Sequence, residues 1–207
     1  GCTGLTSITI SGSVIDVGEY AFRNCNNLTS ITIPASVTSI GKSAFQNCTG
    51  LTSVHISDIA AWCKLTFAMS SSNPLYYAHH LYKDGEEITN HEIPGSVTSI
   101  GEIAFYGCTG LTSVTIPESV TSIGRSAFSG CIGLTSITIS GSVTSIGESA
   151  FSGCTGLASI TIPESVTSIG NNAFYQCHAL SSINIPSKIK TIGNHAFSDC
   201  NSLKSII

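Results

Sequence analysis

Cysteine is the reactive residue that recurs most regularly in this 207-residue chain. All of the nine cysteines except Cys63 follow a 23-residue spacing that is broken once: Cys2, Cys25, Cys48, Cys108, Cys131, Cys154, Cys177 and Cys200. Disulfide frameworks usually have an even number of cysteines at irregular spacings. Side chains in one column also point the same way, which fits disulfide geometry poorly and cannot surround a metal ion tetrahedrally. We therefore expect a column of small buried thiols.

Histidine is the next candidate for chemistry, because His55, His79, His80 and His91 lie close together in the sequence. Imidazole is a common metal ligand. Neighbouring residues on a helix point about 100° apart, however, so His79 and His80 are not expected to share an ion. His91 stands in an apolar column and is expected to be a hydrogen-bonded core histidine, near Glu92 or His55. We expect no metal site.

The other polar residues form no catalytic pattern. The chain contains no G-x-S-x-G elbow and no phosphate-binding glycine loop. Cys177 and His178 are neighbours, but no carboxylate stands nearby to orient the imidazole. The sequence therefore predicts a protein that is not an enzyme, with no catalytic residues and no cofactor.

Residues 58–87 form the only segment with an individual composition, including the sole Trp62 and the sole Met69. One interpretation is a protruding aromatic surface that binds a protein, because Trp and Tyr dominate binding hot spots. The other is a small local core formed by Trp62, Leu65, Phe67, Leu75 and Leu81. We favour the core for Trp62 and Phe67, and both interpretations stay open for the tyrosines. The candidate partner-binding residues are Tyr76, Tyr77, His79, His80, Tyr82, His55, Asn90 and Glu92.

An internal repeat must position these residues. Units of 23 residues start at 5, 28, 51, 88, 111, 134, 157, 180 and 203, and the unit from 51 is a long variant that runs to 87. In the unit 111–133, Val114 and Ile116 alternate with polar residues, as in a half-buried strand. A second β-branched run follows at 119–123. Gly124 then indicates a turn that needs a positive φ or a close backbone approach.

The repeat predicts a β-rich solenoid over residues 1–207, wound as a right-handed stack, because one unit is too small to fold alone. First strands would pair in parallel in one sheet, about 40 Å long for nine strands, with short second strands and turns on the other side. In the long variant, Asp58 is expected to cap a short helix and Asn73-Pro74 to begin another. Residues 83–86 are expected to form a hairpin turn.

The recurring pattern Leu-Thr-Ser-Ile-Thr-Ile-Pro-x-Ser-Val-Thr-Ser-Ile-Gly-x-x-Ala-Phe-x-x-Cys resembles the BspA-like (Treponema pallidum-type) leucine-rich repeat. The likeness covers nearly the whole chain, and the segment that begins Asp58-Ile-Ala-Ala-Trp-Cys63 resembles a variant repeat of such proteins. The resemblance implies a leucine-rich-repeat solenoid on the surface of, or secreted by, bacteria or parasitic protists, with a role in adhesion or host-protein binding. His91 departs from the pattern, which has Ile or Val there.

Composition limits the partners. The net charge is −4 and no basic stripe is present, so no nucleic acid is expected. No apolar run approaches the roughly 18 residues needed for a membrane span. We expect a protein partner, either a host extracellular protein or another surface protein.

The two ends of the chain and the uniform strand face suggest two further expectations. The chain begins in the tail of a repeat and ends at Ile207 inside a strand, without polar caps. We therefore expect a piece of a longer protein, or end-to-end self-association of copies. The alternative function is a structural spacer or surface-layer element whose binding module lies outside this chain, and the uniform Ser and Thr columns of the first strands favour it.

Overall fold

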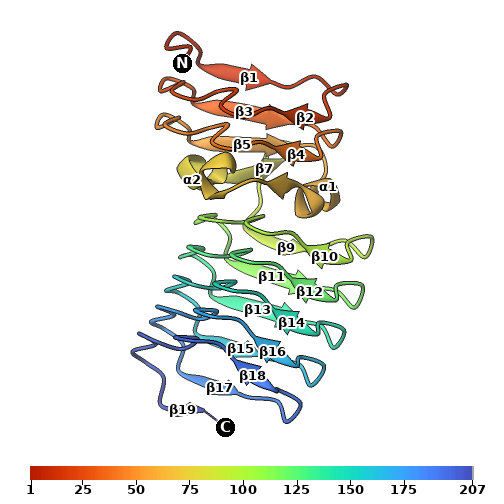
Figure 1. Cartoon of the computed structure of the whole chain (residues 1–207), viewed down its shortest axis with the longest axis vertical. Helices are drawn as coiled ribbons and strands as arrows, with labels where there is room; N and C mark the ends of the chain where they lie inside the picture. Colours follow the sequence, from red (N-terminus) through yellow and green to blue (C-terminus); the bar gives the residue numbers. More distant parts are fainter. Residues whose placement is uncertain (207) are drawn as a thin grey trace.

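The computed structural model describes residues 1–206 and confirms the predicted repeat solenoid, an elongated stack of short strands (Figure 1). Ile207, the expected end of the last strand, lies outside the described residues. Each unit has a first strand. In most units Ser and Thr alternate with Ile or Val in this strand, and paired strands are shifted by one repeat, as Ser113 pairs with Ser136. These first strands are β1 (Ser7–Thr9), β3 (Ser30–Ile33), β5 (Ser53–Ile56), β9 (Asn90–Glu92), β11 (Ser113–Ile116), β13 (Ser136–Ile139), β15 (Ser159–Thr161), β17 (Ser182–Asn184) and β19 (Ser205–Ile206).

Second strands of two residues run beside the first strands and make their own parallel ladders. One ladder joins β2 (Asp16–Val17), β4 (Ser39–Ile40) and β6 (Thr66–Phe67). The other joins β10 (Ser99–Ile100), β12 (Ser122–Ile123), β14 (Ser145–Ile146), β16 (Ser168–Ile169) and β18 (Thr191–Ile192).

A turn edge follows the second strands. It consists of residues 18–27, 41–50, 68–80, 101–110, 124–133, 147–156, 170–179 and 193–202. In regular units, amides of one turn donate to carbonyls of the next, as Phe105 N does to Ala127 O at 2.7 Å. The positive φ that we considered for Gly124 lies instead at Ser126 (φ 52°) and Gly130 (φ 74°). The other expectation for Gly124 is confirmed, because an added Cβ would come within 2.8 Å of Ile100 O.

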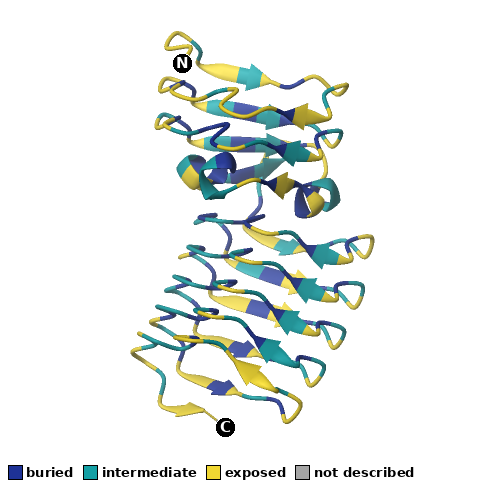
Figure 2. Cartoon of the chain, in the orientation of Figure 1, coloured by how far each residue is buried: buried dark blue, intermediate teal, exposed yellow. Residues whose placement is uncertain are grey.

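The core is a continuous stripe along the stack, dark blue in Figure 2. The regular units contribute the same Leu, Ile, Val, Ala and Phe positions, so like side chains contact like side chains along the stack. The rings of Phe105, Phe128, Phe151 and Phe174 lie nearly parallel, with successive centroids 5.1 to 5.5 Å apart. Offset stacking at this distance adds stabilisation beyond the apolar area that is buried.

The cysteine column is confirmed as a column of free, mostly buried thiols. Its thiols find regular partners, because Cys131 and Cys154 each donate to the carbonyl of the phenylalanine 26 residues earlier, at 3.1 Å. Burial raises the pKa of Cys108 and of Cys154 to about 12. These thiols are therefore protonated and unreactive at neutral pH.

The long unit folds much as the sequence predicts. Helix α1 (Ile59–Lys64) begins after Asp58, whose carboxylate accepts the Ala61 amide at 2.8 Å. A short 3₁₀ turn (Ser70–Ser72) leads to helix α2 (Leu75–Ala78). Strands β7 (Leu81–Lys83) and β8 (Glu86–Glu87) then form an antiparallel hairpin around residues 84–85.

Two expectations for this unit are wrong. The first strands do not form one sheet: β1, β3, β5, β7 and β8 make one, and β9, β11, β13, β15, β17 and β19 make another. Strand β7 adds to the first sheet beside β5, and the returning β8 ends it, so no ladder continues to β9. Nor do Trp62 and Phe67 close a private core, because they belong to the same continuous cluster as the regular units.

Side chains replace the missing backbone ladder at this break. Trp62 Nε1 donates to Ala104 O at 2.9 Å, and buried Asn73 donates its amide to Ile103 O at 2.7 Å. The backbone also contributes, because Gly101 N donates to Cys63 O at 2.8 Å. The long unit is therefore an adaptor that joins two regular stacks.

Candidate functional site

The predicted partner-binding residues fall into separate groups around the long unit. The first group lies on the outer face of the strands. His55 on β5 is directly paired with Tyr82 on β7, and the two rings stack at 5.0 Å between centroids. Ser53 supports the histidine, because its hydroxyl lies 3.2 Å from His55 Nε2. Elsewhere on this face, the same column holds mainly threonine, so the aromatic pair is a local change in the surface.

The second group lies on the turn edge. Tyr76 on α2 is 38% exposed, and its ring stacks on Tyr106 of the next unit with centroids 5.7 Å apart and planes 9° apart. The ring of Tyr77 meets that of Tyr76 edge to face, with centroids 4.9 Å apart. The Tyr77 hydroxyl accepts a hydrogen bond from the backbone N–H of Asn47 at 2.9 Å. Tyr77 thus helps to hold α2 against the preceding unit, whereas Tyr76 presents an edge to solvent.

His79 and His80 each have a hydrogen-bonding partner within the solenoid. His79 ends α2 in the left-handed region at φ 61°, and its Nδ1 lies 2.9 Å from Gly107 O, so this nitrogen carries the proton and donates. His80 Nδ1 lies 2.6 Å from Glu87 Oε1 on β8. Each imidazole therefore has one nitrogen committed to the fold.

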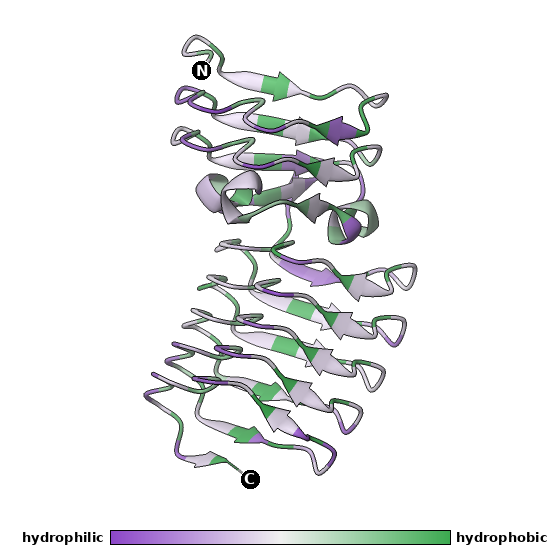
Figure 3. Cartoon of the chain, viewed as in Figure 1, coloured by the Kyte–Doolittle hydropathy of each residue, from purple (hydrophilic) through white to green (hydrophobic). Residues whose placement is uncertain are grey.

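Asn90 and Glu92 are exposed on β9, in the second sheet, so the structure does not place them in one ladder with His55 and Tyr82. Figure 3 shows this strand as more hydrophilic than the other first strands. Between them, His91 pairs in register with Val114. The expected hydrogen bond of His91 is wrong, because its buried Nε2 has no partner within residues 1–206. Burial, and then the charge of Lys83, lower the pKa of His91.

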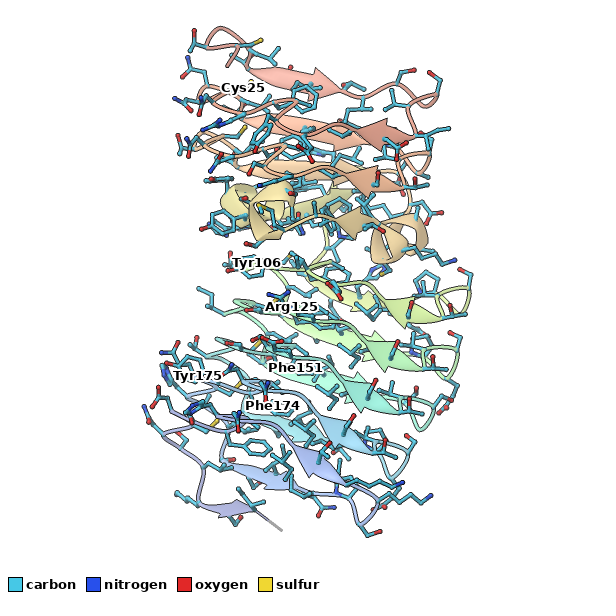
Figure 4. All side chains as sticks on the ribbon, in the orientation of Figure 1. Cys25, Tyr106, Arg125, Phe151, Phe174 and Tyr175 are labelled. Atoms are coloured by element: carbon cyan, nitrogen blue, oxygen red, sulfur yellow. The ribbon has the colours of Figure 1, made fainter. Side chains whose placement is uncertain are left out.

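Sequence reasoning missed a pocket on the turn edge at the break between the two stacks. It has a volume of about 220 Å³ and combines charged, aromatic and thioether side chains from three successive units. Figure 4 labels two of its residues, Tyr106 and Arg125, on the same edge of the stack. Comparison of repeat positions could have found it, because Tyr106 stands where the next two units have Ser129 and Ser152. The lining residues are Ala68, Met69, Ser70, Glu102, Ile103, Tyr106, Arg125 and Ser126.

A shallower apolar groove of about 350 Å³ runs beside α1. Val37, Ala61 and Leu65 line it, with Asp58 and Lys64 at its polar margin. Within residues 1–206, no group of three or more His, Cys, Asp or Glu side chains is placed to hold a metal ion. No helix in the described part of the chain is both long enough and apolar enough to cross a bilayer.

Comparison with known proteins connects this architecture to a family. The sequence pattern described as the BspA type leucine rich repeat region (6 copies) matches residues 1–77 and 77–204. The crystal structure of a leucine rich cell surface protein from Faecalibacterium prausnitzii A2-165 is similar, with a TM-score of 0.71 and 33% identity. That match covers 98% of this chain and 59% of the other.

Two further crystal structures are similar. A Treponema pallidum leucine rich repeat protein has a TM-score of 0.54 and 25% identity over 97% of this chain and 78% of the other. A leucine-rich repeat protein from Bacteroides ovatus has a TM-score of 0.50 and 29% identity over 97% of this chain and 60% of the other. This chain thus spans about three fifths of the length of the Faecalibacterium and Bacteroides proteins. No match to a curated protein was found.

Proposed function

This chain belongs to the BspA-type leucine-rich-repeat family, and on that basis we propose that it is a non-catalytic scaffold that binds a protein partner. The partner is a host extracellular protein or another surface protein, and the site of action is the cell surface or the extracellular space. The chain is one solenoid in this proposal, with units that begin at 5, 28, 51, 88, 111, 134, 157, 180 and 203. The similarity to a leucine rich cell surface protein from Faecalibacterium prausnitzii supports the location.

The observation that carries the proposal is the gathering of exposed or half-buried aromatic side chains at the long unit. Two stacked pairs, His55 with Tyr82 and Tyr76 with Tyr106, stand where regular units have mainly small polar residues. The stack does not require these rings, because the other units pack without them. Rigid aromatic side chains that are partly exposed supply large contact areas at low entropic cost, as is typical of binding hot spots.

A second candidate function, the structural spacer, has its own support. The outer face of the first strands is uniform over most of its length, with Ser113 paired to Ser136 and Thr115 to Thr138. A recognition face usually varies in side chain, whereas a repeated Ser-x-Thr face provides length without a distinct site. The aromatic pairs at the long unit favour binding over the spacer.

The test compares two double variants of the chain. Tyr76→Ser with Tyr82→Thr removes the exposed Tyr76 and the half-buried Tyr82 of the long unit, and Thr is the residue that β3 has in the column of Tyr82. Tyr20→Ser with Tyr175→Ser is the matched control, with two tyrosines removed from regular units. Both variants are checked for folding by thermal unfolding and circular dichroism.

Binding to a panel of purified plasma and extracellular-matrix proteins is measured by surface plasmon resonance. We expect at least one protein to bind the unchanged chain, and the affinity to fall by about tenfold or more in the long-unit variant only. Equal binding by both variants would place the site elsewhere on the solenoid. Absence of binding to the whole panel would favour the spacer.

A further inference from the structure

The pocket on the turn edge contains two charged residues, Glu102 and Arg125, that the protein-binding proposal does not use. Its walls come from residues 68–70 of the long unit, 102–106 of the next unit and 125–126 of the unit after that. The volume of about 220 Å³ is below the range of about 300–1,000 Å³ that is typical for drug-sized ligands. The pocket therefore suits a ligand of the size of one ring or one side chain.

Stacking of the units does not require the side chains of Glu102, Tyr106 and Arg125 in this pocket. The repeat position of Tyr106 holds Ser129 and Ser152 in the next two units. The repeat position of Glu102 holds Arg125, Glu148, Asn171 and Asn194 in the units that follow. A position that accepts Glu, Arg and Asn in one fold imposes no side chain, so the combination at the pocket is free to serve recognition.

Tyr106 offers a ring surface to a ligand in this pocket. Tyr76 covers one side of the ring in a parallel stack. In the following unit the same position holds the small Ser129, so no second ring stacks on the opposite side. The flat apolar face of a saturated ring can pack on such a tyrosine, as apolar groups pack on aromatic faces generally.

The charges of the pocket cancel. Glu102 and Arg125 both line it, and over residues 1–206 neither has an oppositely charged group within the 4.0 Å of a salt bridge. A cationic or anionic ligand would meet a like charge as well as an opposite one. A purely apolar ligand would remove both charged groups from water without replacing their hydrogen bonds, which is costly.

A neutral ring with several hydroxyl groups satisfies all of these groups together. Its hydroxyls can donate to the Glu102 carboxylate and accept from the Arg125 guanidinium, which offers five N–H donors. Its C–H face can pack on Tyr106. We propose that this pocket binds one neutral hexopyranose residue of a glycan, with Glu102, Arg125 and Tyr106 as the recognising side chains.

The test uses simple neutral sugars as probes. Methyl glycosides of glucose, galactose, mannose and N-acetylglucosamine are titrated into the chain, with binding detected by saturation-transfer NMR and quantified by calorimetry. We expect at least one of them to bind, and Tyr106→Ser, Glu102→Asn and Arg125→Asn each to weaken that binding by about tenfold or more. Each substitution introduces a residue that the same column holds elsewhere, so the stack is expected to tolerate it.

The matched control is Tyr175→Ser, which changes the same repeat position three units further along. This variant should bind the sugar as the unchanged chain does. Failure of all four glycosides to bind, or equal binding by Tyr106→Ser and Tyr175→Ser, would overturn the proposal.

Two further arms separate the ligand classes. Tighter binding of N-acetylneuraminic acid would contradict the neutral ring, and tighter binding of N-acetylated amino acid amides would mean that the pocket receives a side chain of a protein. The outcome can be distinguished from that of the protein-binding test, because Glu102→Asn and Arg125→Asn leave both aromatic pairs of the protein-binding proposal in place.

Discussion

The buried thiol column predicts an unusually steep loss of stability at alkaline pH. Six thiols with no exposed surface have their pKa raised by burial: Cys48, Cys63, Cys108, Cys131, Cys154 and Cys177. In the unfolded chain a thiol titrates near its ordinary value of 9.0, whereas folded Cys63 titrates at about 12. Because the folded pKa is the higher one, this stability is fully present below about pH 9 and is lost as the pH rises toward 12.

The magnitude follows from the two titrations. At about pH 10, ionisation lowers the free energy of the unfolded state by about 1.4 kcal/mol for each thiol, while the folded thiol stays protonated. Six thiols give a loss of about 8 kcal/mol between neutral pH and pH 10, which is comparable to the whole stability of an ordinary domain, about 5–15 kcal/mol.

The assay is urea unfolding at a series of pH values, followed by circular dichroism under anaerobic conditions with a reductant. The comparison variant carries Cys108→Ala, Cys131→Ala and Cys154→Ala. Its loss of stability between neutral pH and pH 10 should shrink to about 4 kcal/mol, because only three of the six fully buried thiols remain. Its stability at neutral pH will also be lower, but the pH dependence is the quantity compared. If both proteins lose stability equally between neutral pH and pH 10, the thiols do not cause the loss and the reasoning is wrong.

Three other outcomes can be measured. Trp62→Phe should lower the free energy of unfolding by about 1–3 kcal/mol, because Ala104 O loses the shorter of its two buried hydrogen bonds and keeps only the longer one from Asn73. Chemical denaturation measures this loss, and an unchanged midpoint would mean that the Trp62 bond does not contribute. Asp58→Ala should cost about 0.5–2 kcal/mol through loss of the cap on Ala61 N, whereas Asp58→Asn should restore most of it, measured in the same way. Alkylation of the native protein followed by mass spectrometry should modify exposed Cys2 first, and rapid modification of the buried column would contradict the packing.

Much of the fold is predictable from the sequence, because the same pattern of apolar, polar and turn residues recurs in the repeated units. Alternation of β-branched and polar residues predicts strands such as β11. The fixed spacing of Leu111 and Leu134 predicts that β11 and β13 pair in parallel with a shift of one repeat. The free cysteine column follows from the same spacing. Local signals in the long unit were also sufficient, since the capping carboxylate of Asp58 and the turn at 84–85 act within a few residues of their positions in the chain.

The sequence also determined that aromatic residues would concentrate at residues 58–87, but it did not determine how they are divided. Trp62 became an internal donor to the next unit, Tyr77 a support for α2, and Tyr76 a partly exposed stack on Tyr106. Only tertiary structure separates these roles, because each depends on a partner some 30 to 42 residues away. Regular spacing does not extend across the irregular unit to indicate those partners.

The interruption between β8 and β9 and the pocket at Glu102, Tyr106 and Arg125 are likewise decided by three-dimensional packing. The sequence supplied the residues, and the repeat placed them on the turn edge. The hairpin of β7 and β8 added to the first sheet and ended its ladder, and residues 68–70 lie beside the next unit at this break. Local propensity sets which segments become strands, but strand pairing is a contact between segments that are distant in the sequence. The pairing of β7 with β5 separated the two stacks and shaped the surface between them.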